Sequence, residues 1–135
     1  MKIQRFEDLL AWQEARALTR AVYASTAKGA LSRDFGLRDQ LQRAAVSVMS
    51  NIAEGFERTG RLEKLQYMNI ARASCAEVKS LLYVCLDNGA LAAGSAINLQ
   101  SQCTQISRLL SGLIRSVSTR SSPPQALSSD SDSGH

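Results

Sequence analysis

The residue types best suited to catalysis gather in one short helical segment, where Ser47, Ser50, Asn51 and Glu54 share a polar side. A serine nucleophile needs a neighbouring base, but the one histidine of the chain is His135, its last residue. Small polar residues at this spacing also form hydrogen bonds where two helices pack closely together. Because no base completes a catalytic geometry, we interpret the group as packing residues and expect a protein that is not an enzyme.

Three charged side chains, Arg43, Glu54 and Glu77, fall beside the apolar stripes of predicted helices. In one interpretation the glutamates are metal ligands and Arg43 binds an anion. In the other, the three form an interhelical ion-pair network, since Arg and Glu are seldom buried unless they are paired. We favour the network, because the sequence lacks the Glu-x-x-His pattern of di-iron bundles, and we expect neither a metal nor a cofactor.

A basic cluster of Arg58, Arg61 and Lys64 lies between two predicted helices, and Arg33 and Arg38 lie near the start of the earlier helix. On a single chain, such a cluster is an ordinary solvated helix end. Repeated around a ring of subunits, it becomes a basic rim that contacts several phosphates at once. Both interpretations stay open, and the second predicts nucleic-acid binding.

The overall charge is compatible with such a rim but does not require one. Sixteen Lys and Arg against twelve Asp and Glu give a net charge of +4. This excess is far below the basic density of a dedicated nucleic-acid-binding protein. Tyr67 and Tyr83 have faces on which bases could stack, although packing in the core or at a subunit interface is the default for both.

The elements that position these residues are helices. The chain has 135 residues, and its two prolines are adjacent at 123 and 124, so nothing before them must break a helix. Apolar residues recur every three or four positions over about 7–25, 34–57, 60–87 and 95–117, and two of these stretches carry heptad seams. Short connections force neighbouring helices to reverse direction. We therefore predict an all-α fold, an antiparallel up-down-up-down four-helix bundle over 1–117, with a disordered Ser-rich C-terminal tail over 118–135.

The second predicted helix has an apolar arc roughly 200° wide, which exceeds what the partners within one bundle cover. Val46, Met49 and Ala53 lie at the edge of this arc. We expect these three residues to form a subunit interface.

Cysteine usage and the N-terminal sequence indicate the compartment. Cys75, Cys85 and Cys103 have no CxxC spacing and fall on apolar helix faces, where we expect buried, reduced thiols. Glu7 and Asp8 interrupt the place where an export signal would carry its apolar stretch. Residues 88–107 are uncharged but too polar to span a bilayer. We expect a soluble cytoplasmic protein without a membrane partner.

The segment 37–58, LRDQLQRAAVSVMSNIAEGFER, closely resembles the signature of a four-helix-bundle family. The family includes proteins encoded in intervening sequences of bacterial large-subunit ribosomal RNA, and the accessory protein of diversity-generating retroelements is more distantly similar. The resemblance runs from about residue 6 to residue 113 and includes Phe6, Asp8, Leu9, Trp12, Tyr23, Arg61, Ala71, Ser74 and Glu77. It implies a ring-shaped homopentamer with no established enzymatic activity.

These observations lead to one expected function and one alternative. The expected function is that of a non-enzymatic homopentameric scaffold that binds RNA, DNA or a nucleoprotein through the basic rim. The alternative is a protein–protein adaptor ring that does not bind nucleic acid. A steep dependence of binding on salt concentration would distinguish the first from the second.

Overall fold

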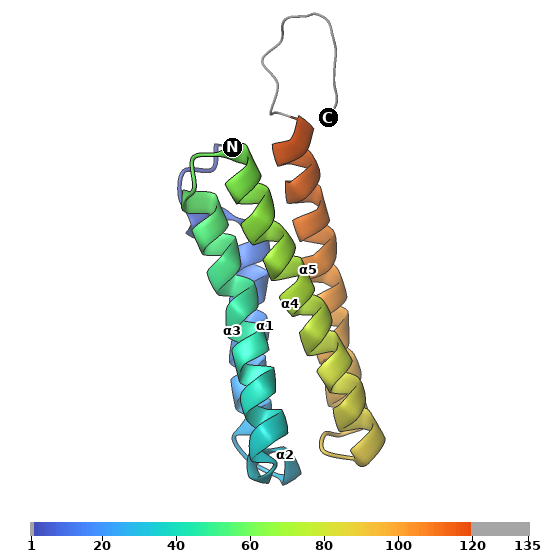
Figure 1. The fold of residues 1–135 in the computed structure, drawn as a ribbon. Helices are drawn as coiled ribbons and strands as arrows, with labels where there is room; N and C mark the ends of the chain where they lie inside the picture. The colour runs from blue at the N-terminus through green and yellow to red at the C-terminus, as the bar shows by residue number, and fades with distance from the viewer. Residues whose placement is uncertain (1, 120–135) are drawn as a thin grey trace, which may run out of the picture.

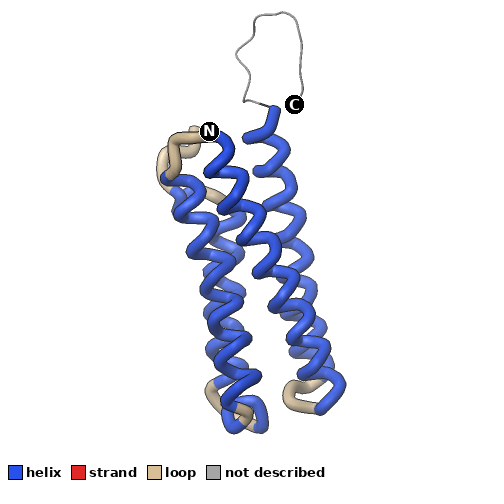
Figure 2. The backbone as a smooth tube through the Cα atoms, viewed as in Figure 1, coloured by secondary structure: helices blue, strands red, loops and turns tan. Residues whose placement is uncertain are grey.

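Four long helices run alternately down and up in the computed structural model, which describes residues 2–119 (Figure 1). The described part of the chain is helical apart from its N-terminal segment and short connections, and it contains no strand (Figure 2). The elements in chain order are η1 (Phe6–Asp8), α1 (Leu10–Thr26), α2 (Ala30–Arg33), α3 (Phe35–Glu57), α4 (Arg61–Asn88) and α5 (Ala93–Thr119). The predicted antiparallel up-down-up-down bundle is confirmed.

Each long helix packs mainly against two others. Helix α3 lies between α1 and α4, and α5 closes the bundle between α4 and α1. The predicted heptad seams fill the centre: Met68, Ala71, Cys75, Val78, Leu82 and Cys85 of α4 are buried, and so are Leu99, Cys103, Ile106 and Leu110 of α5. Burial of these apolar rows is the main source of stability for helices of this kind.

Capping residues satisfy the backbone groups at several helix ends. The Asp34 side chain accepts a hydrogen bond of 3.3 Å from the backbone N–H of Leu37, which caps α3. Helix α4 ends at Gly89, whose φ of 71° lies in the left-handed region that glycine adopts without strain. The backbone N–H of Ala90 then donates to the carbonyl of Cys85 at 2.9 Å and satisfies one of the last carbonyls of the helix.

Boundaries differ from the prediction by two residues or more in four places. Helix α1 begins at Leu10 and not at residue 7, because Phe6–Asp8 form the separate short helix η1. Residues 30–33 form a short helix where the sequence predicts none, because Leu31 is fully buried at the end of the core and draws this turn against the bundle. Helix α5 begins at Ala93, two residues before its predicted start at residue 95. The same helix continues through 118 and 119, so the first two residues of the predicted tail are helical, and the rest of that prediction lies outside the described residues.

Across the described helices, none combines the length and the apolar character that crossing a membrane requires.

Candidate functional site

The polar group on α3 packs against α4. The hydroxyl oxygens of Ser47 and Ser74 lie 2.7 Å apart and join the two helices by a hydrogen bond. The Asn51 amide donates to the Ser47 hydroxyl at 3.0 Å and to the Ser47 carbonyl at 2.8 Å. Ser47 therefore packs against α4, whereas these bonds of Asn51 stay within its own helix.

The predicted network of Arg43, Glu54 and Glu77 is wrong. All three side chains are exposed, and within residues 2–119 no ion pair joins any two of them. Glu54 lies 3.9 Å from the guanidinium of Arg58 on its own helix, and Glu77 accepts a hydrogen bond of 3.4 Å from Gln40. Exposed charges gain little from pairing, so nothing brings these residues together across the bundle.

Cationic side chains near the connection from α3 to α4 form hydrogen bonds between these two helices. Arg58 donates to the Tyr67 hydroxyl at 2.8 Å, and its guanidinium carbon lies 4.8 Å from the centre of the Tyr67 ring. Lys64 donates to the Phe56 carbonyl at 2.8 Å and satisfies a carbonyl in the last turn of α3. Arg61 is exposed at the start of α4. Two of the three predicted rim cations therefore have structural partners.

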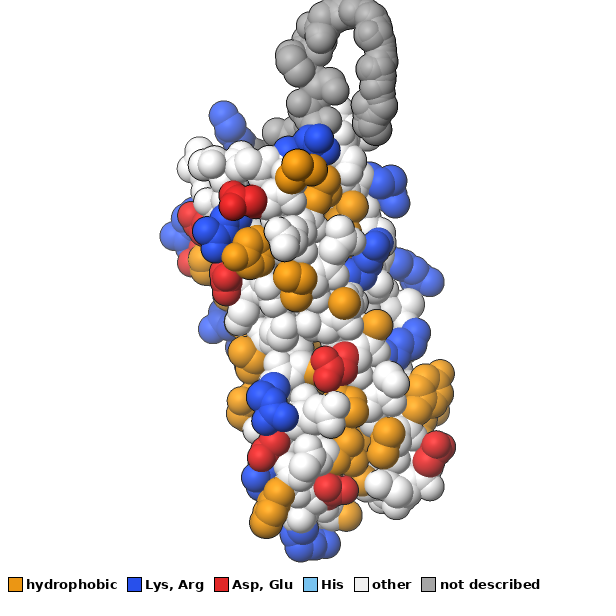
Figure 3. Space-filling view, viewed as in Figure 1, with side chains coloured by type: hydrophobic (Ala, Val, Ile, Leu, Met, Phe, Trp, Pro, Cys, Tyr) orange, Lys and Arg blue, Asp and Glu red, His pale blue; other side chains and the backbone are white. Residues whose placement is uncertain are grey.

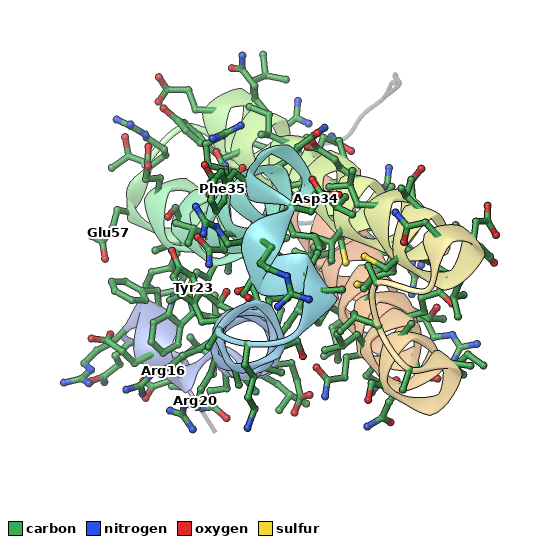
Figure 4. All side chains as sticks on the ribbon, turned by 90° about the horizontal axis from the view of Figure 1, so that it is seen from below. Arg16, Arg20, Tyr23, Asp34, Phe35 and Glu57 are labelled. Atoms are coloured by element: carbon green, nitrogen blue, oxygen red, sulfur yellow. The ribbon has the colours of Figure 1, made fainter. Side chains whose placement is uncertain are left out.

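Arg33 and Arg38 lie at the opposite end of the bundle from this cluster. Helix α3 separates Arg38 from Arg58 by about 30 Å, given a rise of about 1.5 Å per residue. Figure 4 looks onto the end that carries α2 and shows Asp34 and Phe35 where α2 joins α3. Arg38 is engaged there with Asp39 at 2.9 Å and with the Ser32 carbonyl at 3.1 Å. The five predicted cations thus do not form one rim on the protomer, which corrects that prediction.

The predicted subunit-interface residues differ in their exposure. Met49 is half-buried and packs against the core of its own protomer, and Ala53 is also half-buried. Val46 is 37% exposed and lines a shallow depression between α1 and α3 together with Tyr23. Figure 4 shows Tyr23, Arg16 and Arg20 on the outward side of α1. Contacts within the protomer therefore explain part of the apolar width of α3, and Val46 is the residue of the three that faces solvent.

A groove between α4 and α5 is the strongest candidate site. Its volume is about 600 Å³, and its lining includes three cations, Lys79, Arg108 and Arg115, with no carboxylate. A fourth cation, Arg72, reaches across from α4 and donates to the Ser111 hydroxyl at 3.2 Å. We call the surface formed by Arg72, Lys79, Arg108 and Arg115 the α4–α5 groove. Figure 3 shows basic side chains following one another along the side of the molecule formed by α4 and α5.

Heptad spacing on both helices places the four cations. Arg72 and Lys79 are seven residues apart on α4, and so are Arg108 and Arg115 on α5. Each pair therefore falls on one side of its helix, about 10 Å apart along the axis. The short connection from α4 to α5 makes the helices antiparallel neighbours, so the two pairs face the same groove.

The wall of the groove is small and polar. The Lys79 ammonium donates to the Thr104 hydroxyl at 2.8 Å, and Ser107 and Ser111 also line the groove. Helix α5 contains no Asp or Glu along its length, so Arg108 and Arg115 are its only charged residues. Hydroxyl groups and cations without nearby carboxylates favour the binding of an anion such as phosphate.

Two buried thiols lie at the floor of the groove. The Cys75 thiol donates to the Cys103 carbonyl at 3.1 Å, and both cysteines line the groove. The side-chain hydrogen bond between the two thiols lowers the pKa of Cys75 and raises that of Cys103, and burial adds to the increase at Cys103. Burial also raises the pKa of Cys85, which lies elsewhere in the core. The prediction of three buried free thiols is confirmed.

Sequence reasoning missed the α4–α5 groove. The available signal was the pairing of heptad-spaced cations on two helices that a short turn joins, with Ser and Thr between them. In the sequence, the apolar seams of these two helices dominate the pattern. The cations on their flanks become a site when the two helices are aligned as neighbours.

The fold and the sequence are similar to those of known proteins. A protein of unknown function from the S23 ribosomal protein family of Bacteroides thetaiotaomicron has a structure that matches with a TM-score of 0.71 at 18% sequence identity. The match covers 78% of this chain and 99% of that one. No curated protein matches the sequence. The model of the family described as 23S rRNA-intervening sequence protein matches residues 7–112, so the chain belongs to that family.

Proposed function

We propose that the protein is a non-enzymatic homo-oligomeric scaffold, a pentamer, that binds nucleic acid through the α4–α5 groove. The observation that carries this proposal is the groove itself, which three cations and no carboxylate line and to which Arg72 adds a fourth cation through its hydrogen bond with Ser111. Four of the sixteen Lys and Arg residues of the chain lie along this one groove. This groove replaces the rim between α3 and α4 as the proposed contact surface.

The chemistry of the groove suits a phosphate backbone. Guanidinium groups form paired hydrogen bonds with phosphate oxygens, and an ammonium binds phosphate as a point charge. Contacts of this kind position a nucleic acid but do not read its sequence. The name of the family refers to an intervening sequence in 23S rRNA, which fits a partner of this class. Binding should therefore tolerate changes of sequence and weaken steeply as salt rises.

Self-association would multiply the groove. A ring presents one groove per subunit, and contacts to a single long nucleic acid would raise the effective affinity above that of one protomer. Val46 and Tyr23 provide exposed apolar surface between α1 and α3, on a different pair of helices from the groove. Assembly through α1 and α3 would leave the cations of α4 and α5 available for a ligand.

Fluorescence anisotropy with labelled RNA and DNA at several salt concentrations tests the proposal. The groove variant replaces Arg72, Lys79, Arg108 and Arg115 with Gln. A matched variant replaces four exposed cations outside both the groove and the α1 and α3 face, Lys2, Lys28, Arg33 and Arg61, so that both variants lose the same charge. We expect the groove variant to lose binding by at least about tenfold and to show a shallower salt dependence, while the matched variant binds nearly as wild type.

Two outcomes would contradict the proposal. Equal losses in the two variants would mean that overall charge and not the groove attracts the nucleic acid. If the wild type binds neither RNA nor DNA at low salt, the protein–protein adaptor takes over as the better function. Light scattering on the same samples measures the oligomeric mass, and a monomeric wild type would remove the scaffold from the proposal.

A further inference from the structure

We infer that the α4–α5 groove takes single-stranded nucleic acid and that Tyr83 stacks on an unpaired base at one end of it. This inference rests on the proposed function, because it names the class of nucleic acid for the same groove. It adds a residue that lies outside the cationic set, and it predicts a preference of single strands over duplexes.

Tyr83 continues the basic row of α4. It follows Lys79 by four residues and Arg72 by eleven, spacings that put all three on one side of the helix. The side chain is 55% exposed, although a tyrosine on a bundle helix usually buries its ring. The aromatic face is therefore available beside the last cation of the row.

On α5, the row of residues that faces the groove also ends in an exposed apolar side chain. Ile97 is 55% exposed and precedes Thr104 by seven residues and Arg108 by eleven. The Thr104 hydroxyl accepts from Lys79, which fixes the alignment of the two rows. Towards the connection between α4 and α5, the cations of the groove are thus followed by two exposed side chains, the aromatic Tyr83 and the aliphatic Ile97. Figure 3 shows hydrophobic and acidic side chains below the basic ones along that side.

The distance from Lys79 to Tyr83 suits one nucleotide. Four residues correspond to about 6 Å along the helix axis. A nucleotide whose phosphate contacts the Lys79 ammonium can place its own base, or that of its neighbour, against the Tyr83 ring. Backbone cations combined with an aromatic platform are the usual means of binding single strands without sequence preference.

A duplex would use only part of this surface. Its bases are stacked on one another and paired, so their faces are closed to Tyr83, and its phosphates would contact the cations alone. An abasic phosphodiester chain has the same limitation for a different reason, because it has no base to stack. The Tyr83 contribution should therefore be specific to single strands that carry bases.

Binding of three probes of equal length tests the inference: oligothymidine, an abasic phosphodiester chain and a DNA duplex. The variant Tyr83→Leu removes the aromatic face but keeps apolar bulk, and Tyr83→Trp keeps an aromatic face. Phe35→Leu is the matched control, since Phe35 is 64% exposed at the start of α3, outside both the groove and the depression that Val46 and Tyr23 line. We expect Y83L to weaken oligothymidine binding by about 5- to 100-fold and to leave the abasic chain and the duplex unchanged. Y83W and F35L should bind oligothymidine as wild type does.

Fluorescence of the Y83W protein gives a second readout. A base stacked on the introduced indole should quench its emission when oligothymidine is added, and the abasic chain should not. The wild-type protein, whose one tryptophan is Trp12, gives the background emission. An F35W protein should show neither change.

The results separate failure of this inference from failure of the proposed function. If the wild type binds none of the three probes, the proposed function is wrong. If all three bind through the groove cations and Y83L changes none of them, the proposed function stands and the role of Tyr83 is refuted. A Y83L protein that loses all three probes equally, or that has a lower oligomeric mass, would assign Tyr83 to assembly and also refute the inference.

Discussion

A β-carbon placed on Gly55 would lie 2.9 Å from the β-carbon of Tyr67, closer than two such carbons can pack. Glycine at this position therefore lets α3 and α4 approach each other near their connection. The approach brings the Tyr67 ring under the guanidinium of Arg58 and its hydroxyl within reach of the same group.

Replacing Gly55 with Ala should lower the free energy of unfolding by about 1–3 kcal/mol, because the added methyl group forces the two helix backbones apart. Urea unfolding followed by circular dichroism measures the change. Gly36→Ala is the control, since nothing lies within 4 Å of a β-carbon there, and alanine in an exposed helix should leave stability unchanged or raise it by about 0.5–1 kcal/mol. A G55A protein as stable as G36A would contradict the close approach.

The hydroxyl pair of Ser47 and Ser74 should contribute a measurable coupling between α3 and α4. Single changes to Ala leave one half-buried or buried hydroxyl without its partner, so each should cost about 1 kcal/mol. The double variant S47A/S74A removes both hydroxyls, and its loss should be smaller than the sum of the single losses. Strictly additive losses in urea unfolding would show that the two hydroxyls do not interact.

The helices were predictable because their physical signal is strong and local. Apolar rows with a period near 3.6 residues define the long helices. Asp34 marks the start of α3, where it accepts a backbone hydrogen bond, and Gly89 marks the end of α4, where it adopts the left-handed conformation. The short helix around Leu31 was missed because four residues are too few for a period to appear. The family was also predictable, since the resemblance over 37–58 is confirmed by the model match over 7–112.

The site was harder to predict, because it depends on which side chains face one another across helices. Position beside an apolar stripe suggested that Arg43 pairs with Glu77, but both are exposed and the predicted network does not form. Likewise, Lys64 is a candidate phosphate ligand in the sequence and a partner of the Phe56 carbonyl in the structure. A sequence records the charge of a residue but not the competing partners that its fold supplies.

The three thiols should react at different pH values. The thiolate is the reactive form, and the pKa of Cys75 is lowered by its hydrogen bond with Cys103 and by the charge of Lys79, whereas burial raises that of Cys85. As pH rises, Cys75 should therefore be alkylated by iodoacetamide at a lower pH than Cys85 or Cys103. Peptide mass spectrometry of the native protein measures this order. The variant Lys79→Gln should move Cys75 labelling to higher pH, and labelling of Cys85 before Cys75 would contradict the assignment.

Assembly can be tested at Val46, since this residue of the predicted interface faces solvent in the protomer. Val46→Glu places a charge in the proposed contact between subunits, where its desolvation would be costly, and should lower the oligomeric mass in light scattering. The helical signal in circular dichroism and the thermal unfolding midpoint of the separated V46E protomer should change little, because the substitution removes no core contact. Met49→Glu should differ by lowering both mass and thermal stability, since Met49 also packs against the core of its own chain.

Val84→Glu is the matched control for this experiment. Val84 is 45% exposed on α4, so the substitution introduces the same charge at a valine of similar exposure outside the depression between α1 and α3. We expect V84E to keep the wild-type mass. Equal oligomeric masses for V46E and wild type would exclude the α1 and α3 face from assembly. A lower mass in V84E alone would place the interface on α4 instead. Subunit contacts and the groove would then compete for the same helix.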